Sequence, residues 1–307
     1  MSLKYGIIGT GAIGGYYGAK LSKFGHEVHF LFHKDYEFVK ANGLQIDSVD
    51  GSFHLSNVAA YHHTTDMPQC DVVLVCLKSI NNGLLKEILP PLLHPNTLVI
   101  LIENGIGLEA DLQEQFPTLR IAAGLAFICS GKFNPGVITH QSLGRLVIAP
   151  YSCQDSALLK QIVDDFNTAG IEATCSDYAI ARWKKAVWNI PFNGLTVVLN
   201  TTTDLLLSNK ATESLIKSMM IEVIRTANSI GLEQPLRESF ADTMIAVTKT
   251  MPPYSPSMKL DFDYHRPMEV YYLYSRPVIE AEKHNLDMPL TRMLEKQLTF
   301  IDSLRSE

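Results

Sequence analysis

The chain lacks several features that would assign it to a class of protein at once. No uncharged apolar run reaches the roughly 18 residues that a membrane-spanning helix needs. No cluster of lysine and arginine occurs either, and the formal net charge is -6 with a pI of about 5.9. An acidic balance without a basic patch argues against nucleic acid or an anionic membrane as a partner.

Cysteine is scarce and scattered. The five cysteines form no CxxC pair and no Cys/His spacing typical of a metal site. The pair Cys70 and Cys76 indicates buried thiols, and the adjacent histidines 62 and 63 indicate a loop, rather than metal ligands. We therefore predict reduced thiols in a cytoplasmic protein that binds no metal.

Apolar residues, by contrast, are plentiful. They make up 46% of 307 residues, which is enough for two moderate cores. Strand and helix patterns alternate up to about residue 176, and only helical patterns follow. The sequence therefore predicts an α/β fold with a Rossmann-type dinucleotide-binding domain over residues 1–176. An all-helical substrate or catalytic domain is expected over residues 177–307.

The expected strands cover residues 4–8, 27–32, 71–77, 97–102 and 120–127, a hairpin made by 136–140 and 144–150, and an edge strand at 171–174. The expected helices cover residues 15–24, 156–167, 179–200, 211–230, 235–249, 269–284 and 290–304. Pro191 and Gly194 are expected to interrupt the helix at 179–200. Ser257 is expected to act as the N-cap of a short helix.

A glycine-rich turn, GTGAIG at residues 9–14, follows the first expected strand directly. In this context the first glycine makes a tight turn, the second lets a pyrophosphate approach the backbone, and the third packs helix on strand. The phosphates then lie at the N-terminus of the helix, where N–H groups and the helix dipole favour anions. The motif predicts a dinucleotide site formed by Gly9, Gly11, Ala12, Ile13 and Gly14.

The end of the second strand normally meets the adenosine ribose of the dinucleotide. An acidic residue there suits the 2′-hydroxyl of NAD, whereas a cation accommodates the 2′-phosphate of NADP. Here the strand ends in His33 and Lys34, with Asp35 one step further. This order favours NADP (NADPH), and the alternative is that His33 and Lys34 are two exposed loop residues.

Two polar residues follow other strands. Lys78 comes after the strand at 71–77, and Asn104 comes after the strand at 97–102. Ligands of open parallel sheets bind beyond the carboxyl ends of the strands. Although each could be an ordinary loop residue, their shared placement predicts that Lys78 and Asn104 face a bound cofactor or substrate.

The expected helix at 179–200 is almost wholly apolar apart from one stripe. On a helical wheel, an arc of roughly 80° holds Lys185, Asn189, Asn193, Thr196 and Asn200. A helix that is apolar on its other sides is buried, so the stripe faces either solvent or a polar cavity. Asparagine is a poor helix former and the stripe holds no carboxylate, and both facts favour a site.

Six segments occur in order along the chain: GTGAIGG, LVCLKS around Lys78, ENGIG around Asn104, PGVITH, WKKAVWNIPFNGLT around Lys185, and SMKLDFDYHRPME from Ser257 to Glu269. In this order and approximate spacing they resemble the ketopantoate reductase (2-dehydropantoate 2-reductase) family. The resemblance implies NADPH-dependent reduction of 2-dehydropantoate, a 2-oxo acid, to D-pantoate in pantothenate synthesis.

The same resemblance implies roles for individual residues. Lys185 matches the family's catalytic lysine, and Glu269 matches the acid that helps to hold the substrate. Asn189, Asn193 and Ser257 match the family's substrate-binding residues, and Lys78 and Asn104 match cleft residues that contact the cofactor or the substrate. The sequence departs from the family at His33, Gly194 and Ser275, where arginine, proline and glycine respectively are frequent.

Two alternatives stay open. One is a dehydrogenase on the same two-domain plan that acts on another 2-oxo acid, an imine or an opine-type substrate. The other is a non-catalytic dinucleotide sensor, against which Lys185 and Glu269 argue because a sensor needs neither. A homodimer is one option for assembly, since the sequence does not determine the oligomeric state.

Overall fold

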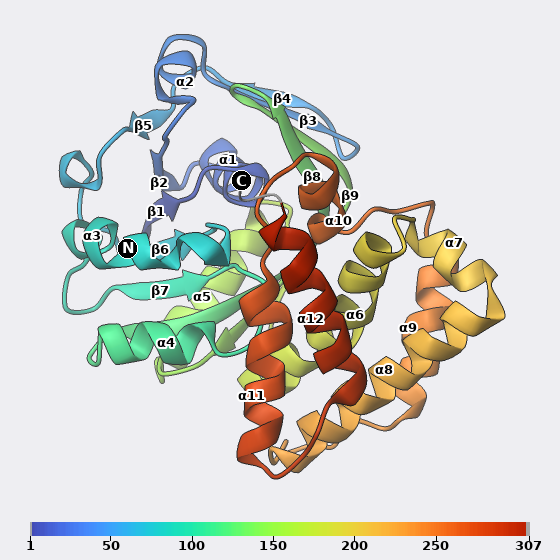
Figure 1. Cartoon of the computed structure of the whole chain (residues 1–307). Coiled ribbons are helices and arrows are strands. Elements are labelled where there is room, and N and C mark those ends of the chain that lie inside the picture. Colours follow the sequence, from blue (N-terminus) through green and yellow to red (C-terminus); the bar gives the residue numbers. More distant parts are fainter. Residues whose placement is uncertain (1, 305–307) are drawn as a thin grey trace. The chain divides into compact units, whose positions relative to one another are not determined.

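The computed structural model describes residues 2–304, which divide into two compact units. The first unit holds the chain up to Glu103 together with Leu108–Tyr178, and the second holds Asn104–Gly107 and the chain from Ala179. In Figure 1 the blue-to-green ribbon belongs mainly to the first unit and the yellow-to-red ribbon to the second. Within the described residues, no helix is long and apolar enough to cross a membrane.

The first unit is built on a ten-stranded, mostly parallel sheet. Its strand order is β4-β3-β9-β8-β7-β6-β1-β2-β5, and β10 pairs with β9. The strands are β1 Lys4–Ile8, β2 Glu27–Leu31, β3 Leu44–Ser48, β4 Phe53–Leu55, β5 Ala59–Tyr61, β6 Val72–Val75, β7 Leu98–Leu101, β8 Arg120–Asn134, β9 Val137–Pro150 and β10 Ala173–Cys175. Every residue of β6 and β7 is buried, as expected for central parallel strands covered on both faces.

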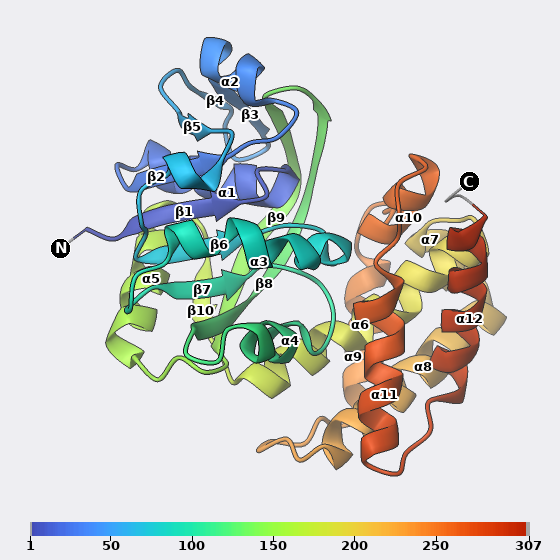
Figure 2. The ribbon, with the colours of Figure 1, turned by 60° about the vertical axis from the view of Figure 1, so that its left-hand side comes forward.

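Helices cover both faces of this sheet. They are α1 Ala12–Lys23, α2 Tyr36–Asn42, α3 Leu85–Ile88, α4 Leu108–Gln115 and α5 Ser156–Thr168. Tyr17 of α1 and Phe166 of α5 pack edge to face with ring centroids 6.0 Å apart, which places both helices on one face. Figure 2 shows α3 and α4 on the other side of the strands. The Rossmann-type architecture that the sequence predicts is therefore present.

The predicted hairpin within residues 136–150 is wrong. This stretch is the single strand β9, which pairs antiparallel with β8, and the connecting turn lies between Asn134 and Val137. Leu143 and Gly144 have positive φ angles of 65° and 126°, and the pairing register shifts beside them. Gly144 therefore marks a β-bulge, whose local sequence resembles that of a turn. Strands β3 to β5 and helices α2 and α4 were not predicted, because they are short and lack a long periodic pattern.

The second unit is all-helical. Its elements are α6 Tyr178–Val198, α7 Thr203–Ser208, α8 Lys210–Ser229, α9 Ser239–Lys249, α10 Ser257–Asp263, a π-helical segment Tyr271–Ser275, α11 Arg276–Lys283 and α12 Pro289–Ser303. One apolar cluster fills the unit, and α6, α8 and α12 contribute to it. This matches the helical second half that the sequence predicts.

The expected interruption of α6 is wrong. The helix runs unbroken from Tyr178 to Val198, with Pro191 inside it. A Cβ added to Gly194 would lie 2.5 Å from Leu294 Cδ2 and 2.8 Å from the Tyr274 hydroxyl. Glycine is thus needed for close packing rather than for a break. Burial on nearly all sides of α6 outweighs the cost of a proline in the helix.

Three predicted helix starts also need correction. Helix α9 begins at Ser239 rather than at Pro235, because the Asn228 side chain donates to Leu236 O at 2.8 Å and accepts from Leu236 N at 2.7 Å. Ser257 is the first residue of α10 rather than its N-cap, and Pro256 precedes it. The predicted helix at 269–284 begins instead with the π-helical segment and continues as α11.

Candidate active site

The glycine turn of the first unit has the geometry of a phosphate cradle. A Cβ on Gly9 (φ +87°) would lie 2.8 Å from the Cys76 carbonyl oxygen, and one on Gly14 would lie 2.5 Å from Gly9 O. On Gly11, in contrast, a Cβ would meet no heavy atom of the described chain within 4 Å. Ala12 and Ile13 open α1, where the first N–H groups of a helix have no intrahelical partner. The turn therefore fits the pyrophosphate of a dinucleotide.

The residues after β2 divide into exposed and paired side chains. His33 and Lys34 are exposed. The Asp35 carboxylate forms an ion pair with Lys132 and accepts the Gly136 N–H at 3.0 Å. Lys132 also donates to Thr10 O of the glycine turn at 3.1 Å. Asp35, the acid that follows His33 and Lys34, is thus already paired with a cation, while His33 and Lys34 are exposed.

Lys78 and Asn104 fall in different units. Lys78 is half-buried and lies between β6 and the short helical segment Ser79–Leu84. Asn104 is also half-buried and belongs to the second unit with the three residues that follow it. Lys78 and Asn104 therefore belong to separate units, each of which is described by itself.

The short loop Asn104–Gly107 packs on the π-helical segment. Ile106 N donates to Tyr272 O at 2.9 Å. Gly105 has φ +122°, and a Cβ there would lie 2.6 Å from Tyr272 O. Gly107 has φ +85°, and a Cβ there would lie 2.5 Å from Arg276 Nε. Gly105 is therefore required by a close approach of two backbones, and Gly107 by its positive φ and the adjacent Arg276 side chain. Turns of π-helix often occur at functional sites.

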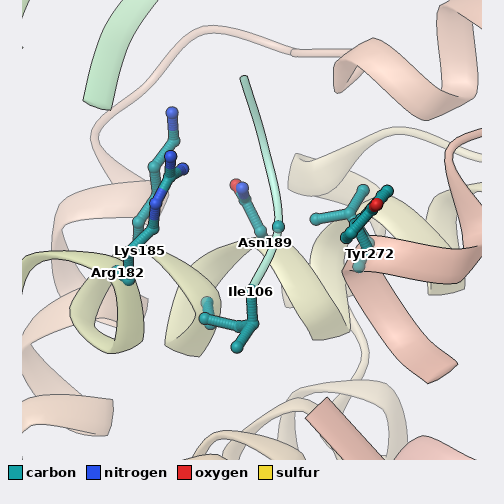
Figure 3. A pocket seen from close by; sticks show the side chains of 8 residues that line it. Ile106, Arg182, Lys185, Asn189 and Tyr272 are labelled. Carbon is teal, nitrogen blue, oxygen red and sulfur yellow. The ribbon is translucent and has the colours of Figure 1, made fainter. Parts of the chain in front are cut away.

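This loop and α6 line a pocket within the second unit. The lining residues are Gly105, Ile106, Arg182, Lys185, Ala186, Asn189, Tyr272 and Leu273. Figure 3 shows the side chains of Arg182, Lys185 and Asn189 rising on the same side of α6. The cavity is about 10 Å³, which by itself would admit about one water molecule. The pocket alone is therefore too small for an organic substrate.

The charge of Lys185 is strongly affected by its surroundings. Burial and, to a smaller extent, the charge of Arg182 lower the pKa of Lys185, and the charge of Glu269 partly opposes them, so that the pKa is about 7. Glu269 is itself only 4% exposed. A lysine that changes protonation near pH 7 can give up a proton in a catalytic step, as a general acid must.

Two family models match the chain. The model described as "Ketopantoate reductase PanE/ApbA" matches residues 5–152, and "Ketopantoate reductase PanE/ApbA C terminal" matches residues 177–302. The chain belongs to the ketopantoate reductase family. The two matched ranges contain the glycine turn and the whole of the segment from Lys185 to Glu269. The resemblance drawn from six motifs is confirmed.

Relatives match over nearly the full length. A 2-dehydropantoate 2-reductase of Nostoc sp. (strain PCC 7120) is 43% identical over 305 residues, which is 97% of this chain and 95% of the relative. The crystal structure of 2-dehydropantoate 2-reductase from Geobacter metallireducens GS-15 has a TM-score of 0.94 at 35% identity, covering 97% of this chain and 99% of that chain. The corresponding structure from Methylococcus capsulatus gives 0.91 at 32% identity, covering 99% and 98%.

In this member of the ketopantoate reductase family, the five polar residues of the α6 stripe do not all line the pocket. Lys185 and Asn189 line the pocket. Asn193 is only 2% exposed; its Nδ2 donates to Asn189 O at 3.1 Å and its Oδ1 accepts the Met258 N–H at 3.2 Å. Asn193 thereby connects α6 to the start of α10, where Ser257 lies half-buried.

The other two members of the stripe take no part in the pocket. The Thr196 hydroxyl donates to Phe192 O at 2.6 Å, within the helix itself. Asn200 is exposed, follows the end of α6 and has φ +47°. Of the five residues that the wheel places in the stripe, Lys185 and Asn189 line the pocket.

Sequence reasoning missed Arg182. It lies one turn before Lys185, falls within the same helical arc and lines the same pocket, although it is only 3% exposed. Extending the wheel by one turn toward the N-terminus would have included it. Tyr272 and Leu273 were also missed, and no local pattern could have found them, because their place in the pocket depends on how the loop Asn104–Gly107 packs.

Proposed function

We propose that the chain is a 2-dehydropantoate 2-reductase, which reduces the keto group of 2-dehydropantoate to the hydroxyl group of D-pantoate. The observation that carries this proposal is the pocket in which Lys185 lies between Arg182 and Asn189, in a chain 43% identical to a relative of that name over almost its whole length. The substrate is a small 2-oxo acid.

The residues of the second unit supply binding and proton transfer, while the nicotinamide cofactor, when bound, supplies the hydride. The Lys185 ammonium donates a hydrogen bond to the keto oxygen and stabilises the negative charge that develops there. It then gives that oxygen a proton. The negative charge of Glu269 favours the protonated lysine before the reaction, because it raises the pKa of Lys185 against the effect of burial.

Substrate positioning falls to the amide and hydroxyl groups near Lys185. Asn189 lines the pocket and Asn104 adjoins the pocket residue Gly105, so both are suited to hydrogen-bond the 2-oxo acid. We assign Ser257 to the substrate as well, with Asn193 holding the start of α10 in place through Met258 N. Such positioning contributes to rate by holding the reactants in the reactive geometry.

The family uses a nicotinamide dinucleotide, and we propose NADP(H) for this chain. The glycine turn at Gly9, Gly11 and Gly14 fits the pyrophosphate, and Asp35, the acid that would favour NAD, is paired with Lys132. In this proposal residues 1–176 bind the cofactor, with Lys78 beside it, and residues 177–307 bind the substrate together with Asn104. A homodimer and a cytoplasmic location stay predictions.

The test is oxidation of NADPH by purified protein against a panel of 2-oxo acids. A site that hydrogen-bonds the hydroxyl of 2-dehydropantoate should reject 2-oxoisovalerate, which lacks it, by at least about a hundredfold in kcat/KM. Equal rates with both acids would contradict the assignment to pantothenate synthesis and leave a broader 2-oxo acid reductase. No oxidation with any 2-oxo acid would favour an opine-type substrate or a sensor instead.

A further inference from the structure

Two neighbouring strands of the first unit deliver three histidines to one edge of the sheet. Strands β2 and β5 pair in parallel, with Leu31 opposite Tyr61. The residues that follow the two strands therefore emerge side by side. His33 follows β2, and His62 and His63 follow β5 directly. We call His33, His62 and His63 the histidine cluster.

The members of the cluster touch one another. The rings of His33 and His62 are stacked, with centroids 6.1 Å apart and planes 6° from parallel. The rings of His62 and His63 meet edge to face with centroids 4.7 Å apart, and the Tyr36 ring centroid lies 5.4 Å from that of His62. All three imidazoles are exposed, so a ligand can reach them and they can carry charge in contact with water.

Charged side chains of both signs surround the cluster. Lys34 is exposed and follows His33. Asp35, the nearest acid in sequence, is engaged by Lys132 and Gly136. The remaining charged side chains of the adjoining helix and turn are Glu37, Lys40 and Asp66, and all three are exposed. The histidines are not arranged to hold a metal ion together with other described residues.

The position of the cluster identifies the anion. The end of β2 meets the adenosine ribose in this fold, and the Thr10 hydroxyl of the glycine turn donates to Leu31 O at 2.8 Å, which fixes that end beside the phosphate cradle. We propose that His62, together with His33 and Lys34, binds the 2′-phosphate of NADP, and that His63 supports the His62 ring. This inference rests on the proposed nicotinamide-dependent function. It adds to the proposed cofactor site the residues that follow β5, a strand outside the glycine turn at residues 9–14.

The proposed site has a built-in dependence on pH. A phosphate monoester reaches its dianionic form above about pH 6, and an imidazole attracts it by charge only while the imidazole is protonated. Binding of a 2′-phosphate should therefore be strongest near neutral pH and weaken as the pH rises toward 8.5.

The experiment measures the binding of two small ligands to the full chain by calorimetry, 2′,5′-ADP and 5′-ADP, at pH 6.5 and 8.5. We expect His62→Gln to weaken 2′,5′-ADP binding about three- to tenfold at pH 6.5, as for an exposed ionic contact, and to have little effect at pH 8.5. Binding of 5′-ADP should not change. The variant His62→Lys should keep its affinity for 2′,5′-ADP at pH 8.5, where the wild type loses it.

A matched control is His54→Gln, which changes an exposed histidine on β4 of the same unit and should behave as the wild type. If His62→Gln binds 2′,5′-ADP as tightly as the wild type at pH 6.5, the role of His62 is wrong. A wild type that does not distinguish the two ligands would overturn both this site and the preference for NADP. The reductase assignment would survive that result if NADH were still oxidised by 2-dehydropantoate.

Discussion

The glycine turn of the first unit and the helix α6 of the second represent two ways of building a functional region. The turn acts through its backbone, and the most informative fact about it is that a side chain at Gly11 would have nothing beside it. Helix α6 acts through side chains whose properties are set by their neighbours, as the pKa of Lys185 near 7 shows. The glycine turn can be recognised from the sequence because the spacing of its glycines defines it. The properties of the α6 side chains depend instead on the residues that pack around them.

The largest effect is expected on the helix side of this comparison. Replacing Lys185 with alanine removes the proposed general acid, so kcat should fall by about 10²- to 10⁴-fold. The dissociation constant of NADPH should stay nearly the same, because the cofactor cradle lies in the other unit. The adjacent Lys184 is exposed, so Lys184→Ala should be almost silent. A Lys185→Ala enzyme with near wild-type kcat would end the proposed role.

In the glycine turn, alanine substitutions at Gly11 and at Gly14 should have different effects. At Gly11 a methyl group fits the protein alone but occupies the approach of the pyrophosphate, so Gly11→Ala should weaken NADPH binding about ten- to a hundredfold with little change in Tm. At Gly14 the added Cβ would lie 2.5 Å from Gly9 O, so Gly14→Ala should destabilise the fold by about 1–3 kcal/mol. Thermal unfolding and cofactor titration of both variants separate the two effects; a Gly11→Ala protein that binds NADPH normally would contradict the cradle.

Within α6, substitutions of Asn193 and Asn189 should distinguish a structural residue from a substrate-binding one. Asn193→Ala leaves the buried N–H of Met258 without its acceptor, which should cost about 1–3 kcal/mol and lower Tm by a few degrees. Asn189→Ala should leave Tm nearly unchanged and raise the KM for the 2-oxo acid, because Asn189 lines the pocket. Steady-state kinetics with thermal unfolding decide the assignment. The reverse pattern would show that Asn193 binds substrate and Asn189 is structural.

The smallest expected effect is a shift of the pH profile. In its proposed role as the acid Lys185 must be protonated, and its pKa is about 7, so kcat/KM for ketone reduction should fall as the pH rises above about 7. Removing the charge of Arg182, which lowers that pKa, should move the fall to higher pH in Arg182→Gln. Removing the charge of Glu269, which raises it, should move the fall to lower pH in Glu269→Gln. Rate profiles from pH 6 to 9 with Lys184→Gln as control test this, and a flat wild-type profile would refute it.

The amino-acid sequence by itself determined the features that depend on neighbours along the chain. The strand, glycine turn and helix from Lys4 to Lys23 were predicted because their signals are local, and so were the buried runs of β6 and β7. The stripe on α6 was found because a helix repeats at a fixed angle, and the ordered motifs indicated the family.

Only the tertiary structure decided the features that depend on residues far apart in sequence. Pro191 stays inside a continuous helix because the surrounding unit buries it. The loop Asn104–Gly107 belongs with the helical unit because Ile106 N bonds to Tyr272 O, more than a hundred residues away. The shift in the pKa of Lys185 and the bond from Met258 to Asn193 arise from burial and charge that no local pattern encodes.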